Sequence, residues 1–320
     1  MGAQQREPQR LAEEVTMRIP QPRATALVGI IGIAALGAVG LRRARAAGRA
    51  RLSRYPARTS RLSHGRIAYI DTGPRQAPAI LSLHGMFGGY DQGFDVAAAH
   101  TAGMRIIAPS RFGYPGSDIR GRGTPAEQVE ALIELLDELG VERVLVMGSS
   151  AGGTAAIRFV LDHPERAKGL ILFSSAPPLP ERPARYSAFQ GPPRLMHSDA
   201  VMLLLSPLFP LAMSMPPSTV ISMLPIAERR AGALLDARIT NPDMARHFEE
   251  YPIESLSVPV LILAAEDDRL VPAARMLTAL HRFPDPQLLL VDDGGHLLAG
   301  HHEEVSRAIA ALVEASGMEA

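Results

Sequence analysis

Ser150 is the residue of this sequence whose surroundings best suit nucleophilic chemistry. It lies between Gly148 and Gly152 in the run Gly-Ser-Ser-Ala-Gly, directly after the apolar segment 143–147. A turn sharp enough to raise a serine hydroxyl above a sheet crowds the backbone on both sides, and glycine relieves that crowding. The small residues that follow allow a helix to lie close to the sheet with its positive N-terminal end near the serine oxygen. The pattern predicts an activated serine.

A carboxylate and a histidine follow two later apolar segments. Asp268 lies in the run Glu-Asp-Asp-Arg after segment 258–264, and His296 ends the run Asp-Asp-Gly-Gly-His after segment 287–291. The carboxyl ends of parallel strands meet at one edge of a sheet, so we expect both side chains to lie beside Ser150. A serine activated by a histidine, itself oriented by a carboxylate, transfers acyl groups through a covalent intermediate.

An alternation of apolar and helical segments supplies the sheet that would bring these residues together. The run Thr124-Pro-Ala-Glu127 has the form of a helix capping box with proline at the first helical position. The rhythm predicts an α/β fold with a mostly parallel, doubly wound sheet covered by helices on both faces. Strands are expected at 66–71, 79–83, 104–109, 143–147, 169–174, 258–264 and 287–291, and a last helix near 303–315.

From about residue 66 to residue 315 the sequence resembles the α/β-hydrolase superfamily. The resemblance rests on the serine elbow, a His-Gly pair at 84–85, an Asp-x-x-x-Pro loop at 268–272 and a late Gly-His pair at 295–296. It implies the α/β-hydrolase fold and the chain order serine, acid, histidine. Ser150, Asp268 and His296 follow that order.

The resemblance also implies roles for single residues. The family's acid lies four residues before the proline, which points to Asp268, while Glu266 and Asp267 remain alternative candidates. Met86 and Ala151 would donate the two backbone N–H groups of an oxyanion hole.

Other motif residues are expected to be structural. His84 would organise the loop that carries Met86, and the turn-rich loop 108–117 would lie near the pocket floor without a catalytic role. His301 and His302 look like the exposed start of the last helix, with only a minor claim to be the catalytic base.

The rhythm of strands and helices breaks between residues 176 and 257. This segment is rich in proline and methionine, and its apolar stretch 201–215 is too short and too often interrupted by proline to span a membrane. We expect short helices that form a cap over the carboxyl edge of the sheet. Its methionines would either line an apolar acyl pocket or pack the cap's own core.

Composition excludes several classes of protein. The 33 basic residues balance the 33 acidic ones, so no overall field attracts nucleic acid, and no nucleic-acid partner is expected. The chain has no cysteine, which excludes disulfides and thiolate chemistry. No metal-ligand spacing, phosphate loop or dinucleotide fingerprint appears, so neither a metal nor a cofactor is expected.

The N-terminal region suggests a membrane. Residues 1–23 form a polar tail, residues 24–41 carry no charge and would measure about 27 Å as a helix, and residues 42–61 form a basic linker. We expect a single-pass anchor, with the arginines after it holding the catalytic domain, 62–175 plus 258–320, on the cytoplasmic side. The alternative is a cleaved signal that leaves the protein exported.

The combined motifs predict a serine hydrolase that cleaves small, apolar carboxylic esters. The same residues could serve a carbon–carbon bond hydrolase, an amidase or an acyltransferase. A member of another class, which binds a ligand or partner without catalysis, is the remaining alternative.

Overall fold

The computed structural model of the chain describes residues 22–318, with side chains from residue 35 onward. The predicted polar tail therefore lies, up to residue 21, outside the described residues. The chain divides into two compact units, Met1–Arg43 and Ala44–Ala320. Helix α1 (Pro22–Leu52) begins in the first unit, and its last turns, from Ala44 onward, belong to the second. The second unit contains the sheet and all the residues discussed below as a site.

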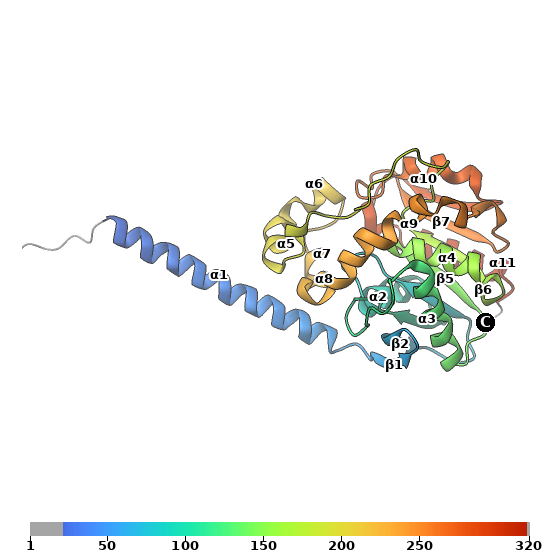
Figure 1. The fold of residues 1–320 in the computed structure, drawn as a ribbon, viewed down its shortest axis with the longest axis horizontal. Coiled ribbons are helices and arrows are strands. Elements are labelled where there is room, and N and C mark those ends of the chain that lie inside the picture. The colour runs from blue at the N-terminus through green and yellow to red at the C-terminus, as the bar shows by residue number, and fades with distance from the viewer. Residues whose placement is uncertain (1–21, 319–320) are drawn as a thin grey trace, which may run out of the picture. The chain divides into compact units, whose positions relative to one another are not determined.

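A single mostly parallel sheet organises the second unit (Figure 1). Within the described residues its eight strands lie in the order β1-β2-β4-β3-β5-β6-β7-β8. Strand β2 runs antiparallel to both β1 and β4, and all other pairs are parallel, which confirms the predicted sheet. The strands are β1 (Arg58–Leu62), β2 (Gly65–Thr72), β3 (Ala79–Leu83), β4 (Arg105–Pro109), β5 (Val144–Ser149), β6 (Ala167–Phe173), β7 (Val260–Ala265) and β8 (Pro286–Val291).

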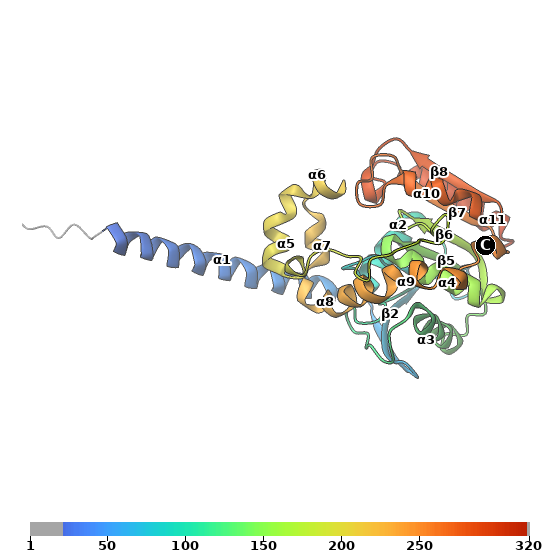
Figure 2. The same ribbon diagram turned by 45° about the horizontal axis from the view of Figure 1, so that its top comes forward.

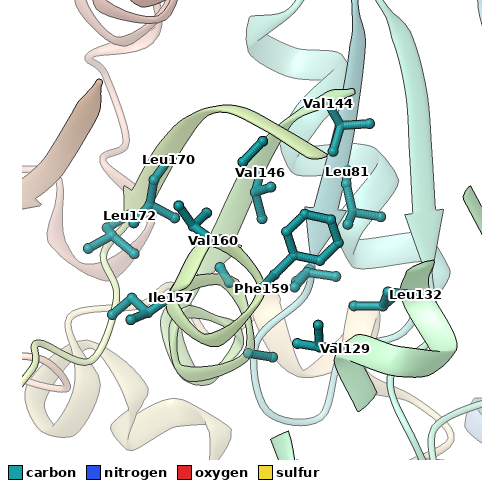
Figure 3. Close-up of a cluster of buried hydrophobic side chains, with 14 of the residues drawn as sticks. Leu81, Val129, Leu132, Val144, Val146, Ile157, Phe159, Val160, Leu170 and Leu172 are labelled. Carbon is teal, nitrogen blue, oxygen red and sulfur yellow. The ribbon is translucent and has the colours of Figure 1, made fainter. Parts of the chain in front are cut away.

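The central strands are buried on both faces because helices cover both. Alternate residues of a strand point to opposite faces, so Val144 and Val146 of β5 join one apolar cluster while Leu145 and Met147 join another. Figure 3 shows the first cluster, in which Phe159 of α4 lies against the β5 valines. The helices α3 (Pro125–Glu138), α4 (Gly153–Asp162) and α10 (Ala273–Ala279) contribute to this first cluster, and α2 (Tyr90–His100) and α11 (His302–Ala315) to the second.

Helix α3 begins at the capping box that the sequence predicts. The Thr124 hydroxyl accepts a hydrogen bond from the Glu127 amide at 3.2 Å, and the Glu127 carboxylate accepts one from the Thr124 amide at 3.1 Å. Two amides that no helical carbonyl can reach are satisfied in this way.

Replacing this cap tests its contribution to stability. We expect Thr124→Ala to lower the free energy of unfolding by about 1 kcal/mol, because the Glu127 amide loses its acceptor. Urea denaturation monitored by circular dichroism measures the change. Thr278→Ala is the matched control, since the exposed Thr278 hydroxyl lies in α10 and donates to the Arg275 carbonyl. An equal loss in both variants would contradict a specific role for the cap.

A helical insertion, residues 176–257, separates β6 from β7. In Figures 1 and 2 the helices α5, α6 and α7 form a group beside the sheet rather than on one of its faces. The group has its own apolar cluster, which includes Met202 and Met223, so these two methionines pack the insertion's core. The helices of the insertion are α5 (Asp199–Leu205), α6 (Phe209–Met213), α7 (Thr219–Met223), α8 (Ile226–Leu235) and α9 (Asn241–Arg246), with a π-helical turn at Asp236–Thr240.

The structure contradicts the membrane anchor predicted for residues 24–41. In the part of the chain that the structure describes, no helix combines the length and the apolar character that a membrane crossing requires. Side chains up to residue 34 lie outside that part. The apolar residues belong to the longer helix α1, which continues without a break into arginine-rich turns, and its many glycines and alanines each bury little apolar surface. The cytoplasmic orientation derived from the anchor is withdrawn with it.

Candidate active site

Ser150 lies on a strained turn between a strand and a helix. Strand β5 ends at Ser149, a single 3-10 turn covers Ser150–Gly152, and α4 begins at Gly153. The backbone of Ser150 has a φ of 50°, a left-handed conformation that non-glycine residues rarely adopt. Such strain is characteristic of a serine raised above the carboxyl edge of a sheet.

The flanking glycines are required by close backbone contacts. A β-carbon at Gly152 would lie 2.3 Å from the carbonyl oxygen of Leu83, and one at Gly148 would lie 2.7 Å from the β-carbon of Ala156. Both distances are far below van der Waals contact, and the Leu83 oxygen belongs to the backbone of β3. Any larger residue at Gly152 would therefore push the turn away from β3.

The loop after β3 lies against the serine. We call residues 84–89 the β3 loop. A β-carbon at Gly85 of this loop would lie 3.0 Å from the Ser150 β-carbon. Met86, the next residue, is half-buried, and Ala151 is buried. The structure thus places the segments that carry the two predicted oxyanion donors next to Ser150.

Asp268 and His296 form a buried pair. The Nδ1 atom of the His296 ring lies 2.8 Å from Oδ2 of Asp268, and the two residues are 7% and 3% exposed. The other carboxylate oxygen, Oδ1, accepts hydrogen bonds from the amides of Leu270 at 2.8 Å and Val271 at 3.0 Å. A carboxylate oxygen accepts a hydrogen bond from Nδ1–H, and in that tautomer the Nε2 atom of the ring carries a lone pair.

The alternative acids do not contact the ring. Asp267 is exposed, and its carboxylate accepts a hydrogen bond from the Gly295 amide at 2.8 Å. Glu266 is exposed as well. Of the three acids in this loop, Asp268 has the geometry of a residue that orients His296, while Asp267 supports the backbone of the histidine loop.

No hydrogen bond joins His296 to Ser150 among the residues that the structure describes. Catalytic serine–histidine contacts are commonly long or poorly aligned until substrate binds. The structure therefore brings Asp268 and His296 into contact and places Ser150 between the β3 loop and the start of α4.

His84 is a structural residue, as the sequence predicts. Its Nδ1 atom lies 2.7 Å from the Gly85 carbonyl oxygen, and its Nε2 atom accepts a hydrogen bond from the Arg111 amide at 2.9 Å. Complete burial, together with the nearby Arg111 charge, holds the pKa of the His84 ring well below its usual value. The neutral ring fixes the shape of the β3 loop and is not available as a base.

A buried charge pair that sequence reasoning missed supports the same loop. The Arg111 guanidinium donates to both Asp236 carboxylate oxygens, at 2.6 and 2.7 Å, and its Nε donates to the His84 carbonyl at 2.9 Å. The Tyr114 hydroxyl also donates to Asp236, at 2.5 Å. Loop 108–117 therefore has a specific supporting function, and its partner lies in the insertion.

The insertion also reaches the acid and histidine loops. The Ser214 hydroxyl donates to the Asp267 carbonyl oxygen at 2.6 Å and accepts from the Arg269 amide at 3.2 Å. Its carbonyl oxygen accepts from the His296 amide at 3.3 Å. The sequence carried no signal for this contact, because a serine between two short helices is common.

The two other late histidines are engaged elsewhere. His301 lies 2.8 Å from Asp293 and 2.9 Å from Glu304 through its two ring nitrogens, and the His302 ring packs on that of His100. Across the described residues no group of three or more histidine or acidic side chains has the geometry to hold a metal ion.

A surface cavity of about 750 Å³ lies elsewhere on the second unit. Leu52, Tyr90, Tyr114 and Ile119 are among its lining residues, which include neither Ser150 nor His296. Ser150 and His296 therefore lie outside this cavity.

The chain is similar to several known hydrolases. The chain is 24% identical to an uncharacterized carboxylesterase of Bacillus subtilis over 246 aligned residues. The alignment covers 73% of this chain and 78% of the esterase. It is 28% identical to the 2-hydroxymuconate semialdehyde hydrolase of Pseudomonas putida over 211 aligned residues, and this alignment covers 62% of this chain and 73% of that hydrolase. An alpha/beta hydrolase fold protein from Nakamurella multipartita superposes with a TM-score of 0.64 at 21% identity, over 82% of this chain and 99% of that structure. Residues 80–310 match the alpha/beta hydrolase family, and the chain therefore belongs to that family.

Proposed function

We propose that the protein is a serine hydrolase that cleaves carboxylic esters of small, apolar substrates. The buried contact between His296 and Asp268 is the observation that carries the proposal. Membership of the hydrolase family and the similarity to a carboxylesterase support it. In this proposal residues 62–175 and 258–320 form the catalytic core and the insertion forms its cap.

The reaction proceeds in two acyl transfers. Nε2 of His296 accepts the Ser150 hydroxyl proton while the serine oxygen attacks the ester carbonyl. The Met86 and Ala151 amides stabilise the negative oxygen of the tetrahedral intermediate. The bond to the alkoxy oxygen then breaks, and the alcohol leaves with the proton from His296. A water molecule, deprotonated by His296, attacks the acyl-enzyme; His296 then returns that proton to the Ser150 oxygen as the bond to the acyl group breaks and the acid leaves. Asp268 keeps the ring in the tautomer that these steps require.

A serine nucleophile does not suit the dehalogenase chemistry of some solved structures with this fold. Displacement of halide by a serine oxygen would leave an ether between the serine and the substrate. Water does not hydrolyse this ether, because it has no carbonyl carbon to attack. A carbon–carbon bond hydrolase is the second candidate, favoured by the similarity to 2-hydroxymuconate semialdehyde hydrolase. It would use the same three residues on a substrate with a carbonyl beside the bond to be broken.

Labelling with a fluorophosphonate tests whether Ser150 is an activated nucleophile. The wild-type chain is expected to be labelled, because phosphonylation requires a serine oxygen that has lost its proton to a base. Ser150→Ala is expected to abolish the label. Ser149→Ala is the matched control, because Ser149 is the buried serine next to Ser150. This variant should be labelled to the same extent as the wild type.

The result also separates an enzyme from a member of the fold that only binds a ligand. An unlabelled wild type, or a label that persists in Ser150→Ala, would overturn the proposal. A panel of esters with increasing acyl length would then establish the preferred substrate, and a β-diketone-like compound would test the carbon–carbon alternative.

A further inference from the structure

The β3 loop is held at two carbonyl oxygens, placed evenly around Met86. Arg111 donates to the carbonyl of His84, two residues before Met86. Arg229 of α8, in the insertion, donates to the carbonyl of Gly88, two residues after it. The loop contains three glycines and one residue, Phe87, at a φ of 57°, so its conformation depends on such external contacts.

Arg229 is in turn fixed by a carboxylate that it shares with α1. Its guanidinium is fully buried and donates to the two Asp91 oxygens at 3.1 and 2.8 Å. Arg51 of α1 donates to the same carboxylate at 2.7 Å and to the Ser222 carbonyl of the insertion at 2.5 Å. Asp91 lies in the first turn of α2, which begins at Tyr90, directly after the β3 loop. We call Arg51, Asp91 and Arg229 the arginine clamp.

The ionic state of the clamp is consistent with its geometry. Burial alone would raise the pKa of the Asp91 carboxyl, but hydrogen bonds from Arg229 and Arg51 lower it below its usual value. The carboxylate therefore stays charged and holds both guanidinium groups. A β-carbon on Gly89 would lie 2.9 Å from the Asp91 carboxylate and 3.2 Å from Arg229, so the end of the β3 loop packs directly on the clamp.

The last turns of α1 are seated on the insertion at several further points. Arg45 pairs with the buried Asp199 at 2.8 Å, and Arg49 pairs with Glu228 at 2.6 Å. A β-carbon on Gly48 would lie 2.8 Å from the backbone of Leu224. Arg51 differs from Arg45 and Arg49 because its partner, Asp91, also binds Arg229, which donates to the Gly88 carbonyl of the β3 loop.

We propose that Arg51 is a positioning residue for the oxyanion hole: it completes the arginine clamp, which holds the Gly88 carbonyl and thereby aims the Met86 amide. The inference rests on the proposed function and gives the end of α1 a part in catalysis. Oxyanion donors act only when they already point to the place where negative charge develops. A small displacement of the loop is therefore expected to weaken binding of the transition state more than binding of the substrate.

Arg51→Gln tests the inference, with Arg49→Gln as the matched control on the same helix. Loss of an entire oxyanion donor costs 100- to 1,000-fold in kcat, so displacing one is expected to cost about tenfold, with KM within about twofold of the wild type. Arg49→Gln removes an exposed pair to the insertion without reaching the β3 loop, and its kcat is expected to stay within about twofold.

A tetrahedral inhibitor provides the readout that a structural defect would not change. A trifluoromethyl ketone forms an oxyanion on the serine, so its inhibition constant in Arg51→Gln is expected to rise by the factor by which kcat/KM falls. Arg51→Lys keeps a charged donor to Asp91 and should recover part of the lost kcat. If Arg51→Gln does not fold, the kcat and the inhibition constant of Arg51→Lys, compared with those of the wild type, provide the test.

Two kinds of failure are distinguishable. A wild type that is neither labelled by fluorophosphonate nor active on any ester defeats the proposed function, and this inference with it. An active wild type in which Arg51→Gln and Arg51→Lys match Arg49→Gln, or in which the loss appears only in KM, overturns the role of Arg51 and leaves the function in place.

Discussion

Ser150→Ala and His296→Ala are each expected to lower kcat by about a millionfold, because the nucleophile and its base act as one unit. Removing the serine oxygen leaves no atom to attack the carbonyl, and removing the ring leaves the hydroxyl protonated. Hydrolysis of an activated aryl ester by purified protein measures the loss. The residual activity reflects binding and the oxyanion donors alone.

Ser149→Ala controls for disturbance of the turn. Ser149 is the last residue of β5 and is buried, so its loss should change stability slightly and kcat by only a few fold. Melting temperatures of the three variants show whether each has folded. If kcat fell by only a few fold in Ser150→Ala or in His296→Ala, the nucleophile or the base would be wrongly assigned.

Asp268→Asn is expected to lower kcat by about 10⁴-fold, an effect of tautomer rather than of charge alone. Asparagine can keep its amide oxygen on the Leu270 and Val271 amides, which now bind Oδ1 of Asp268. Its NH₂ group then faces Nδ1 of His296, which must accept a hydrogen bond instead of donating one. The ring proton moves to Nε2, and the base can no longer take the proton of Ser150.

Asp267→Asn is the matched control for this variant. Asp267 accepts a hydrogen bond from the Gly295 amide and does not touch the ring, and an amide oxygen can replace its carboxylate there. A loss of about tenfold or less is expected, since only the support of the histidine loop weakens. Comparable losses in the two variants, measured on the same ester, would contradict the assignment of Asp268 as the acid.

Features that depend on a few neighbouring residues were predictable from the sequence. The elbow at Ser150 and the capping box at Thr124 arise from steric and hydrogen-bonding demands within about five residues, and both occur in the structure. The positions of strands β2 to β8 were predictable for a similar reason, because the pattern of apolar residues follows from which faces are covered, whereas β1 lies in the segment predicted as a basic linker. The choice of Asp268 came from a family spacing, and its contact with His296 agrees with that choice.

Contacts between distant parts of the chain could not be predicted in this way. Arg111 and Asp236 lie 125 positions apart, and Asp91 and Arg229 lie 138 apart, so no local pattern links them. The apolar stretch at 24–41 suggested a membrane because a window of hydropathy cannot show what the following arginines bind. Arg45, Arg49 and Arg51 instead pair with acids of the folded domain. Local chemistry is enough to predict which groups react, whereas the buried charge pairs that support them join remote segments that only folding brings together.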